Sequence, residues 1–295
     1  QRQMCIRDSN YGTGEVRFEA PQITPESTAT KPSEVYKPGA TLDRTLEYGG
    51  KTVPIYRDRP LNVFSDVDFI WTGEENENQR RLEYLGGEFR TRYGIDVSSF
   101  QGEIDWDAVA DDNIDFAMVR VGFRGTGTGS LNTDKYYEQN IRGAMRAGLE
   151  TGVYFFAQAV TVEEAIEEAD YVISLLDGLD INGPVAYDWE MHDSTYRVYG
   201  TSPEMATACA VAFCERIKDA GYTPMVYGGT YVTYMKYDQG ALADYLSWYP
   251  EYKSEKSEKL CPTLVYHMDY WQFSSSRAVA GINGRVDMNI QFIRR

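Results

Sequence analysis

Two carboxylates stand one residue apart in the stretch PVAYDWEMHD, which covers residues 184–193. Its first four residues are typical of the start of a buried strand, and Asp188 and Glu190 then interrupt the apolar run. Residues two apart on a strand point to the same side, with about 7 Å between them along the backbone. Glycosidases use carboxyl pairs at about 5–9 Å. A helix cap beside a salt-bridged glutamate would give the same pattern, so the pair alone does not assign a function.

Two more acids occupy matching positions. Asp96 follows the apolar start of GIDVS, and Asp287 follows an apolar residue in GRVDMN near the C-terminus. Barrel enzymes place catalytic groups at the carboxyl ends of several strands, so all four acids are candidates for one site. Burial and mutual repulsion would raise the pKa of one carboxyl group and leave it a proton donor near neutral pH.

Four aromatic residues accompany the acids as candidates for sugar binding. Tyr154 and Phe156 alternate on one expected strand, Tyr227 lies in MVYGG, and Trp271 lies in YWQF. The face of an aromatic ring stacks on the apolar face of a sugar ring. Each of these side chains is also a reasonable core residue, because aromatic side chains contribute heavily to protein cores.

From Tyr93 onward, short apolar segments alternate with helical patterns. Thr161 and Glu164 have the spacing of a capping box, and Ser202 with Pro203 can open a helix. This alternation over about 200 residues predicts an α/β fold with a parallel sheet. A (β/α) barrel and an open doubly wound sheet both fit, although no G-x-G-x-x-G follows the first strand. The expected strands are 93–98, 116–123, 151–157, 184–190 and 223–229, and the expected helices are 105–112, 134–148, 161–178 and 202–221.

The N-terminal third has a different composition. Residues 21–40 are rich in Pro, Ser, Thr and Glu, so we interpret residues 1–40 as a disordered leader or linker. The first nine residues, QRQMCIRDS, match nothing that follows and are interpreted as non-native. In LEYGGKTVPIY (46–56), the two glycines permit a tight hairpin turn. We therefore expect a small N-terminal extension with a hairpin over 41–92, and a catalytic barrel over 93–295.

Charge and composition exclude several classes of function. The chain of 295 residues carries 29 Lys and Arg against 45 Asp and Glu, a formal net charge of −16, and such a surface repels nucleic acid and anionic lipid. Two histidines and four cysteines without a C-x-x-C pair leave little room for a metal or redox centre. No apolar run approaches the ~18 residues of a membrane helix. We expect free or core cysteines, no metal, no cofactor, no nucleic-acid partner and no membrane span.

The region from Tyr93 to the C-terminus resembles the family 25 glycoside hydrolases, which are lysozyme-type muramidases. Separate motifs support the resemblance, and they follow one another in the order found in the family. The matching segments are GIDVSSFQGEIDW (94–106), FAMVRVGFRGTG (116–127), AGLETGVYFFA (147–157), GPVAYDWE (183–190), MVYGG (225–229) and YWQFSSSRAVAGINGRVDMN (270–289).

The resemblance implies an irregular, TIM-like (β/α) barrel with fewer helices than a full eightfold one. It implies a glycoside hydrolase that cleaves the β-1,4 bond between N-acetylmuramic acid and N-acetylglucosamine in peptidoglycan. Glu190 then matches the general acid/base, and Asp188 matches a charged acid that steers the N-acetyl group of the substrate or stabilises the transition state. Asp96 and Asp287 match two further acids that line the groove. Peptidoglycan lies outside the membrane, so we expect an extracellular or cell-surface monomer.

Two other classes of function stay open from the residues alone. A non-catalytic barrel that binds cell-wall glycans would keep the groove without turnover, and an assay for new reducing ends separates it from a hydrolase. A metal-dependent hydrolase would use the acids as Mg²⁺ or Ca²⁺ ligands, and its activity would be lost in EDTA.

Overall fold

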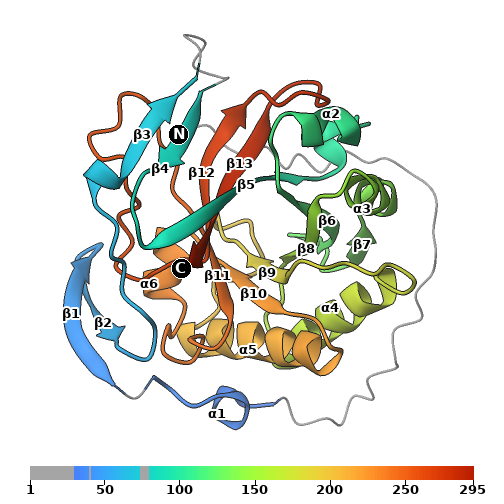
Figure 1. Cartoon of the computed structure of the whole chain (residues 1–295). Helices are drawn as coiled ribbons and strands as arrows, with labels where there is room; N and C mark the ends of the chain where they lie inside the picture. Colours follow the sequence, from blue (N-terminus) through green and yellow to red (C-terminus); the bar gives the residue numbers. More distant parts are fainter. Residues whose placement is uncertain (1–29, 40, 74–79) are drawn as a thin grey trace.

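The computed structural model describes residues 30–39, 41–73 and 80–295. Within these residues, eight strands close into a barrel with helices on the outside (Figure 1). Closure excludes the open doubly wound sheet and confirms the prediction of a (β/α) barrel. In order around the barrel, the strands are β5 (Phe89–Val97), β13 (Val286–Arg294), β12 (Tyr270–Arg277), β11 (Leu246–Pro250), β10 (Pro224–Tyr227), β9 (Val185–Trp189), β8 (Glu150–Ala157) and β6 (Phe116–Arg124), and β5 then pairs with β6.

One barrel strand runs against the others. The pairs from β5 through β6, β8, β9, β10 and β11 to β12 are parallel, whereas β13 is antiparallel to both β12 and β5. The first residues of β13 therefore lie at the barrel end where the parallel strands finish. The register places Asp287, near the start of β13, directly opposite Asp96, near the end of β5.

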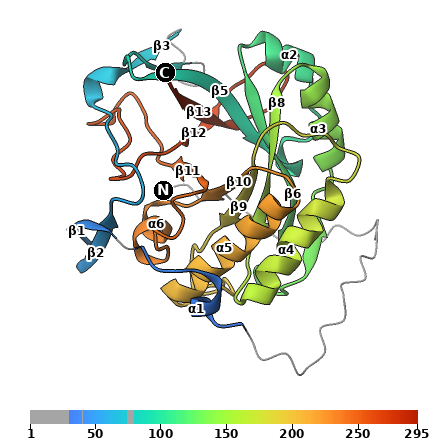
Figure 2. The ribbon, with the colours of Figure 1, turned by 60° about the horizontal axis from the view of Figure 1, so that its bottom comes forward.

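The four helices predicted from the sequence are present, with ends that differ by a few residues, whereas the helix at Thr230–Met235 was not predicted. Thr161 caps α4 through a hydrogen bond from Glu164 N–H, and Ser202 caps α5 in the same way. Figure 2 shows α4 and α5 side by side along the barrel. The connections from β11 to β12 and from β12 to β13 contain no helix in the described residues. The helices of the barrel are α2 (Trp106–Asp111), α3 (Tyr137–Arg146), α4 (Val162–Leu175), α5 (Pro203–Asp219) and α6 (Thr230–Met235), and a short strand β7 (Leu131–Thr133) extends the sheet beyond β6.

The core has an inner and an outer part, separated by the barrel wall. On β9, Tyr187 and Trp189 point outward and pack against the helices, whereas Ala186 points into the barrel. The uninterrupted apolar run of this strand follows from burial on both faces. Asp188 takes the inner position after Ala186, so the carboxylate stands on the inner face near the end of the strand.

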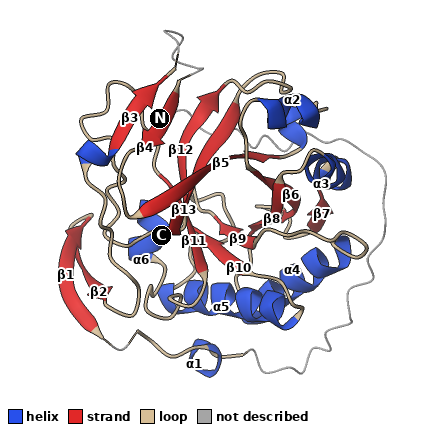
Figure 3. Cartoon of the chain, in the orientation of Figure 1, coloured by secondary structure: helices blue, strands red, loops and turns tan. Residues whose placement is uncertain are grey.

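The N-terminal extension covers the side of the barrel that lacks crossover helices. Its second hairpin consists of β3 (Phe69–Thr72) and β4 (Arg81–Tyr84) and lies beside β12 and β13 (Figure 3). The ring of Phe69 contacts Trp271 of β12 at 5.4 Å and Phe292 of β13 at 6.3 Å between centroids. The extension therefore supplies apolar cover to two strands whose outer faces would otherwise meet water.

The first hairpin of the extension confirms the turn expected from its glycines. β1 (Leu42–Tyr48) pairs antiparallel with β2 (Lys51–Tyr56), and Gly49 and Gly50 have φ of 58° and 75°. Both values lie in the left-handed region that a two-residue hairpin turn of this kind requires.

Residues 30–39 are not the disordered linker that their composition predicts. They include a short helix, α1 (Pro32–Val35), beside α5 in Figures 1 and 2. Thr30 N–H donates to Glu163 at 2.7 Å, and Gly39 N–H donates to Asp238 at 2.9 Å. Val35 and Tyr36 pack on the core, so two apolar side chains are enough to dock a segment of otherwise polar composition. Residues 1–29, including Cys5 and the expected non-native start, lie outside the described part of the chain.

The remaining cysteines are buried free thiols, as expected: Cys209, Cys214 and Cys261. Among the described helices, none has the length and apolar character to cross a membrane.

We expect residues 41–92 to unfold together with the barrel. Phe69→Ala removes a ring that is buried among four other aromatic rings, so it should lower the free energy of unfolding by about 3 kcal/mol. Ile70→Ala, on the exposed face of the same strand, is the matched control and should cost less than about 1 kcal/mol. Urea unfolding followed by tryptophan fluorescence measures both. A separate early transition in Phe69→Ala would show that the extension folds independently.

Candidate active site

The barrel brings the four predicted acids together at one end. Asp96 is the eighth residue of β5, Asp188 the fourth of β9, Glu190 follows β9 directly, and Asp287 is the second residue of β13. All except Asp287 are buried, and Asp287 is partly buried. The acids act on one another in two pairs: Asp96 raises the pKa of Asp287, and Glu190 raises the pKa of Asp188. The site therefore consists of two carboxyl pairs at the mouth of the barrel.

Two amide side chains hold Asp96. Gln272 Nε2 and Asn289 Nδ2 both donate to Asp96 Oδ2, each at 2.8 Å. Asn289 Oδ1 in turn accepts a hydrogen bond from Trp248 Nε1 at 2.8 Å. These contacts fix the amide orientations, because each amide has its oxygen occupied by another donor.

Two tyrosines complete the support of Gln272. Its Oε1 accepts from Tyr227 Oη at 3.2 Å and from Tyr252 Oη at 3.0 Å. The predicted sugar-binding residue Tyr227 is therefore buried in the barrel and orients an amide of the site.

Burial shifts the acids toward their protonated forms. It raises the pKa of Asp96 to about 6, against the opposing effect of the two amide donors. It also raises the pKa of Asp188 well above its usual value, together with the nearby charge of Glu190. The pKa of Asp287 is raised well above its usual value by burial and by Asp96. Burial therefore favours the protonated forms of Asp188 and Asp287, and it makes Asp96 a weaker acid than an ordinary aspartate.

Arg120 of β6 is a buried cation close to the acids, but its charge is largely compensated. Its guanidinium donates to Asp134 at 2.9 and 2.8 Å and to Ser99 Oγ at 3.2 Å. It also lies 5.1 Å from the centroid of the Phe100 ring. Its effect on Asp188 is weaker than that of burial, so the site stays rich in negative charge.

The environments of Asp188 and Glu190 differ in a way that the sequence did not predict. Asp188 Oδ1 is fully buried and accepts no hydrogen bond from any described residue. Glu190 lies nearer the surface, and its Oε2 is 2.6 Å from His192 Nε2. This contact raises the pKa of His192. Deep burial therefore favours the proton on Asp188, whereas the resemblance assigns proton donation to Glu190.

The aromatic residues named from the sequence do not form an open sugar platform. Tyr154, Tyr227 and Phe156 are buried, with Tyr154 and Tyr227 in the inner core and Phe156 in register with Asp188. The expectation for Trp271 is wrong, because this ring is 0% exposed on the outer face of β12, where it contacts Phe69. Alternation explains the error: Gln272 is the residue of this motif that points inward.

Exposed aromatic side chains do occur on the loops that follow the barrel strands. Phe100 comes directly after β5 and is 58% exposed, and Tyr252 comes after β11 and is 48% exposed. Phe100 contacts Arg120, and Tyr252 contacts Gln272, so both adjoin the acids. Tyr199 and Tyr231 are further exposed rings on the loops and helix after β9 and β10.

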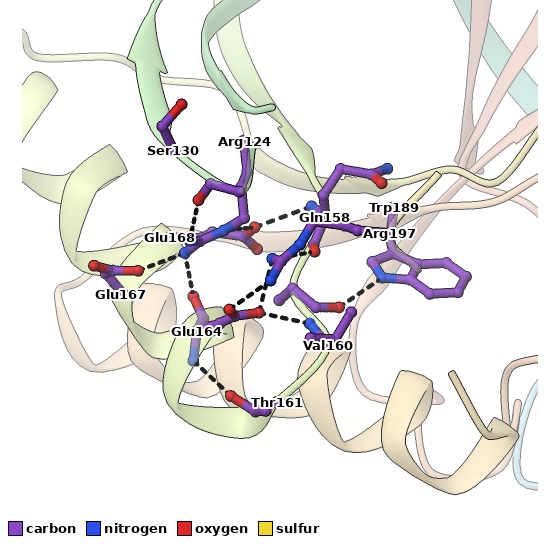
Figure 4. Close-up of polar contacts among 12 residues, drawn as sticks. Arg124, Ser130, Gln158, Val160, Thr161, Glu164, Glu167, Glu168, Trp189 and Arg197 are labelled. Atoms are coloured by element: carbon purple, nitrogen blue, oxygen red, sulfur yellow. Dashed lines mark hydrogen bonds and ion pairs between the residues drawn. The ribbon is translucent and has the colours of Figure 1, made fainter. Parts of the chain in front are cut away.

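A buried ionic network on α4 holds the chain next to Glu190 (Figure 4). Arg124 Nε donates to Glu168 at 2.8 Å, and Glu168 accepts from Gln158 N–H at 3.0 Å. Gln158 Nε2 donates to the backbone oxygen of Glu190 at 2.8 Å. Burial raises the pKa of Glu168 to about 7, while Arg124 and the Gln158 N–H favour its charged form.

The same network fixes the loop that carries His192. Arg197 Nη1 and Nη2 donate to the two carboxylate oxygens of Glu164 at 2.9 and 2.8 Å, and Nη1 also donates to Gln158 O (Figure 4). The Arg197 N–H donates to Thr126 O at 2.9 Å. A bidentate pair of this kind sets position and orientation together.

The sequence analysis missed the polar partners of the acids. Gln272, Asn289, Arg120 and His192 were not singled out, nor was Trp248. A period-2 reading of the strands could have found Gln272, which alternates with Tyr270, but no local pattern separates Asn289 or His192 from surface residues. In the part of the chain that the structure describes, no three His, Cys, Asp or Glu side chains gather in a way that could hold a metal ion.

Comparison with known proteins assigns the family. Residues 95–282, well over half of the chain, match the family model described as "Glycosyl hydrolases family 25". The chain belongs to this family. The four acids, their amide partners and the barrel strands that carry them all fall in or next to the matched segment.

The similar proteins include two lysozymes and a spore cortex lytic enzyme. The chain is 26% identical over 197 residues to an autolytic lysozyme of Clostridium acetobutylicum, a match that covers 66% of this chain and 54% of that protein. The chain thus spans about half the length of this relative. A bacterial lysozyme from Streptomyces coelicolor has a similar structure, with a TM-score of 0.54, 25% identity and coverage of 67% of this chain and 90% of that chain. The Clostridium perfringens spore cortex lytic enzyme SleM shares the fold, with a TM-score of 0.58, 23% identity and coverage of 68% and 67%.

Neutralising Asp96 should stabilise the protein at neutral pH. Its folded-state pKa of about 6 lies above the ordinary value of 3.8, so the folded state binds more protons than the unfolded state between these values. Stability from this group therefore falls as pH rises through that window. We expect Asp96→Asn to raise the free energy of unfolding by about 2–3 kcal/mol at pH 7 and to have little effect near pH 4.

Asp134→Asn is the matched control, because Asp134 is equally buried but forms an ion pair with Arg120. It should destabilise the protein at pH 7 by about 3 kcal/mol. Urea unfolding of both variants at the two pH values checks the prediction. A destabilising effect of Asp96→Asn at pH 7 would contradict it.

Removing the Arg197 clamp should free the loop that follows Glu190. Arg197→Ala deletes the bidentate contact with Glu164 and the bond to Gln158 O, so backbone amides of residues 191–201 should exchange at least about tenfold faster. Hydrogen exchange with mass spectrometry measures this. Arg216→Ala, which removes an exposed ion pair with Asp170, should leave exchange in the loop unchanged. Equal exchange in both variants would show that the clamp does not order the loop.

Proposed function

We propose that this protein is a peptidoglycan hydrolase that cleaves the β-1,4 bond between N-acetylmuramic acid and N-acetylglucosamine. The observation that carries the proposal is the convergence of Asp96, Asp188, Glu190 and Asp287 at the barrel mouth in a member of family 25. Glycoside cleavage passes through an oxocarbenium-like state, which nearby negative charge stabilises. Similarity to an autolytic lysozyme and to a bacterial lysozyme supports this substrate.

Glu190 is proposed as the general acid and base. It is the acid of its pair that lies nearer the surface and contacts a second titratable side chain, His192. A group that donates a proton to the leaving oxygen and later accepts one must exchange protons easily. Asp188 lacks this access, because its side chain is more deeply enclosed.

Asp188 is proposed to act on the reacting sugar. Its unpartnered Oδ1 can accept a hydrogen bond from the N–H of the acetamido group of the substrate. A bound acetamide would take the place of a missing partner, and it would fix the group that lies next to the bond being cleaved. Asp96 and Asp287 lie directly opposite each other on neighbouring strands, and an ionised carboxylate of this pair adds negative charge to the mouth.

The exposed rings beside the acids are proposed to hold the glycan. Phe100 and Tyr252 present aromatic surface next to Arg120 and Gln272, where sugar rings can stack. A glycan strand has no charge on its sugar rings beyond the lactyl or peptide groups, so an acidic protein does not repel the rings themselves. We place the action of the enzyme outside the cell membrane, in the extracellular space or at the cell surface, because peptidoglycan lies there. We expect the enzyme to act as a monomer.

Glu190→Gln should abolish hydrolysis while leaving the fold intact. Loss of general acid catalysis lowers the rate by about 10²–10⁴-fold. The measurement is mass spectrometry of muropeptides after digestion of purified peptidoglycan, which also shows whether the new reducing end is on muramic acid. Glu138→Gln, an exposed acid on α3, is the control and should keep full activity. Wild-type turnover by Glu190→Gln would disprove the assignment of the acid, and no product from the wild type at any pH would favour a glycan-binding barrel.

A further inference from the structure

His192 lies beside the proposed acid, and packing in the core does not explain its position. Its Nε2 is 2.6 Å from Glu190 Oε2, and its side chain is 48% exposed. The ring also contacts Tyr196 at 5.3 Å between centroids. A side chain so open to solvent adds little to the core, so its position against Glu190 needs another explanation.

The chain holds His192 in place through a fixed loop. The loop begins at the end of β9, where Gln158 binds the backbone of Glu190, and Arg197 anchors it to Glu164 and Thr126 five residues beyond His192. Two anchored ends restrict the positions that the imidazole can take. The anchored loop therefore fixes the contact between His192 and Glu190.

The charged groups around His192 favour its protonated form. Glu190 and Asp193 are the carboxylates that act on it directly, and the contact with Glu190 has the largest effect. Behind Glu190 lie Asp188 on the same strand, Asp96 and Asp287 on β5 and β13, and the phenols of Tyr227 and Tyr252. The cation of the site, Arg120, is paired with Asp134. His192 therefore faces Glu190 and Asp193 directly, and carboxyl groups from other elements lie behind Glu190.

We propose that His192 is the proton store of Glu190: the two side chains share one proton between Nε2 and Oε2, and Glu190 delivers that proton to the glycosidic oxygen. The inference rests on the proposed role of Glu190 as general acid. It makes His192 a positioning and proton-holding residue that acts through Glu190.

The proton balance closes over one turnover. At rest the proton is on Nε2, and Glu190 is a carboxylate. The proton moves to Oε2 and from there to the glycosidic oxygen, while the C–O bond breaks and its electron pair stays on the leaving oxygen. Imidazole and carboxylate are then both unprotonated. A water molecule adds its oxygen to the anomeric carbon and returns its proton through Glu190 to the pair.

The alternative source of the proton is Asp188, and the geometry disfavours it. Asp188 is more buried than Glu190, and no described residue donates a hydrogen bond to its Oδ1. The same burial that raises its pKa makes release of its proton unfavourable. A shared proton on the outer side of Glu190 can instead be replaced from solvent through the half-exposed imidazole.

His192→Gln tests the proposal, because glutamine keeps an N–H donor near Glu190 but has no proton to release. We expect the alkaline limb of the kcat profile to move about one pH unit toward acid, with activity largely restored at lower pH. A purely structural role would leave the profile in place. Asp193→Asn removes the other carboxylate that acts on His192 and keeps an oxygen for its contacts with Thr195, so it should cause a smaller shift in the same direction.

Proton NMR titration supplies a readout that does not depend on activity. The chain has two histidines, so comparison with His192→Gln assigns the His192 signal. We expect the wild-type imidazole to titrate above 6.5 and to move back toward that value in Glu190→Gln. An unshifted titration in the wild type overturns the inference. If Glu190→Gln is inactive but His192→Gln keeps the wild-type profile, the inference fails and the proposed function stands, whereas an active Glu190→Gln removes the proposed acid itself.

Discussion

The structure depends on one costly arrangement, the gathering of carboxyl groups in a space that excludes most water. The cation nearest to them, Arg120, is already compensated by Asp134. Unscreened like charges at short range cannot all ionise, so the site lowers its energy by keeping protons. Neutral donors stabilise the charge that remains on Asp96. Two amide side chains donate to its carboxyl group, and two tyrosines donate to one of these amides. Glu190, the acid at the outer edge of this set, contacts a half-exposed imidazole with which it can exchange a proton.

The barrel achieves this gathering by reversing one strand. Had β13 been parallel to its neighbours, its second residue would lie at the opposite end from Asp96. The reversal has a consequence for packing, because strands joined by a hairpin need no crossover helix. The outer faces of β12 and β13 therefore lack the cover that α2–α6 give to the rest of the barrel. The aromatic side chains of the extension supply this cover, and Phe69 does so by packing on Trp271 of β12. The reversed strand that brings Asp287 into the site is therefore also the reason why this apolar cover is needed.

Much of this could be predicted from the sequence, for physical reasons that differ from element to element. Period-2 and period-3.6 patterns predicted five of the parallel strands and four helices, since burial on one face or both determines these patterns, but they did not predict β11, β12 or α6. The four acids could be found because each interrupts an apolar run. The direction of β13 and the inward side of β12 could not, because alternation defines two faces without saying which faces the barrel. This is why Trp271 was expected in the site and Gln272 was not.

The partners of the acids escaped prediction because they depend on three-dimensional register. Gln158 reaches the backbone of Glu190 only because β8 and β9 are neighbours, and Glu168 reaches Gln158 only because α4 packs against β8. Arg197 then anchors the loop that follows β9 to the same helix, α4, through its contact with Glu164. One ionic network thus supports both the strand end that bears Glu190 and the loop that bears His192. The positions of the acid and of its proton source are therefore set together, by side chains that support the backbone on either side of them.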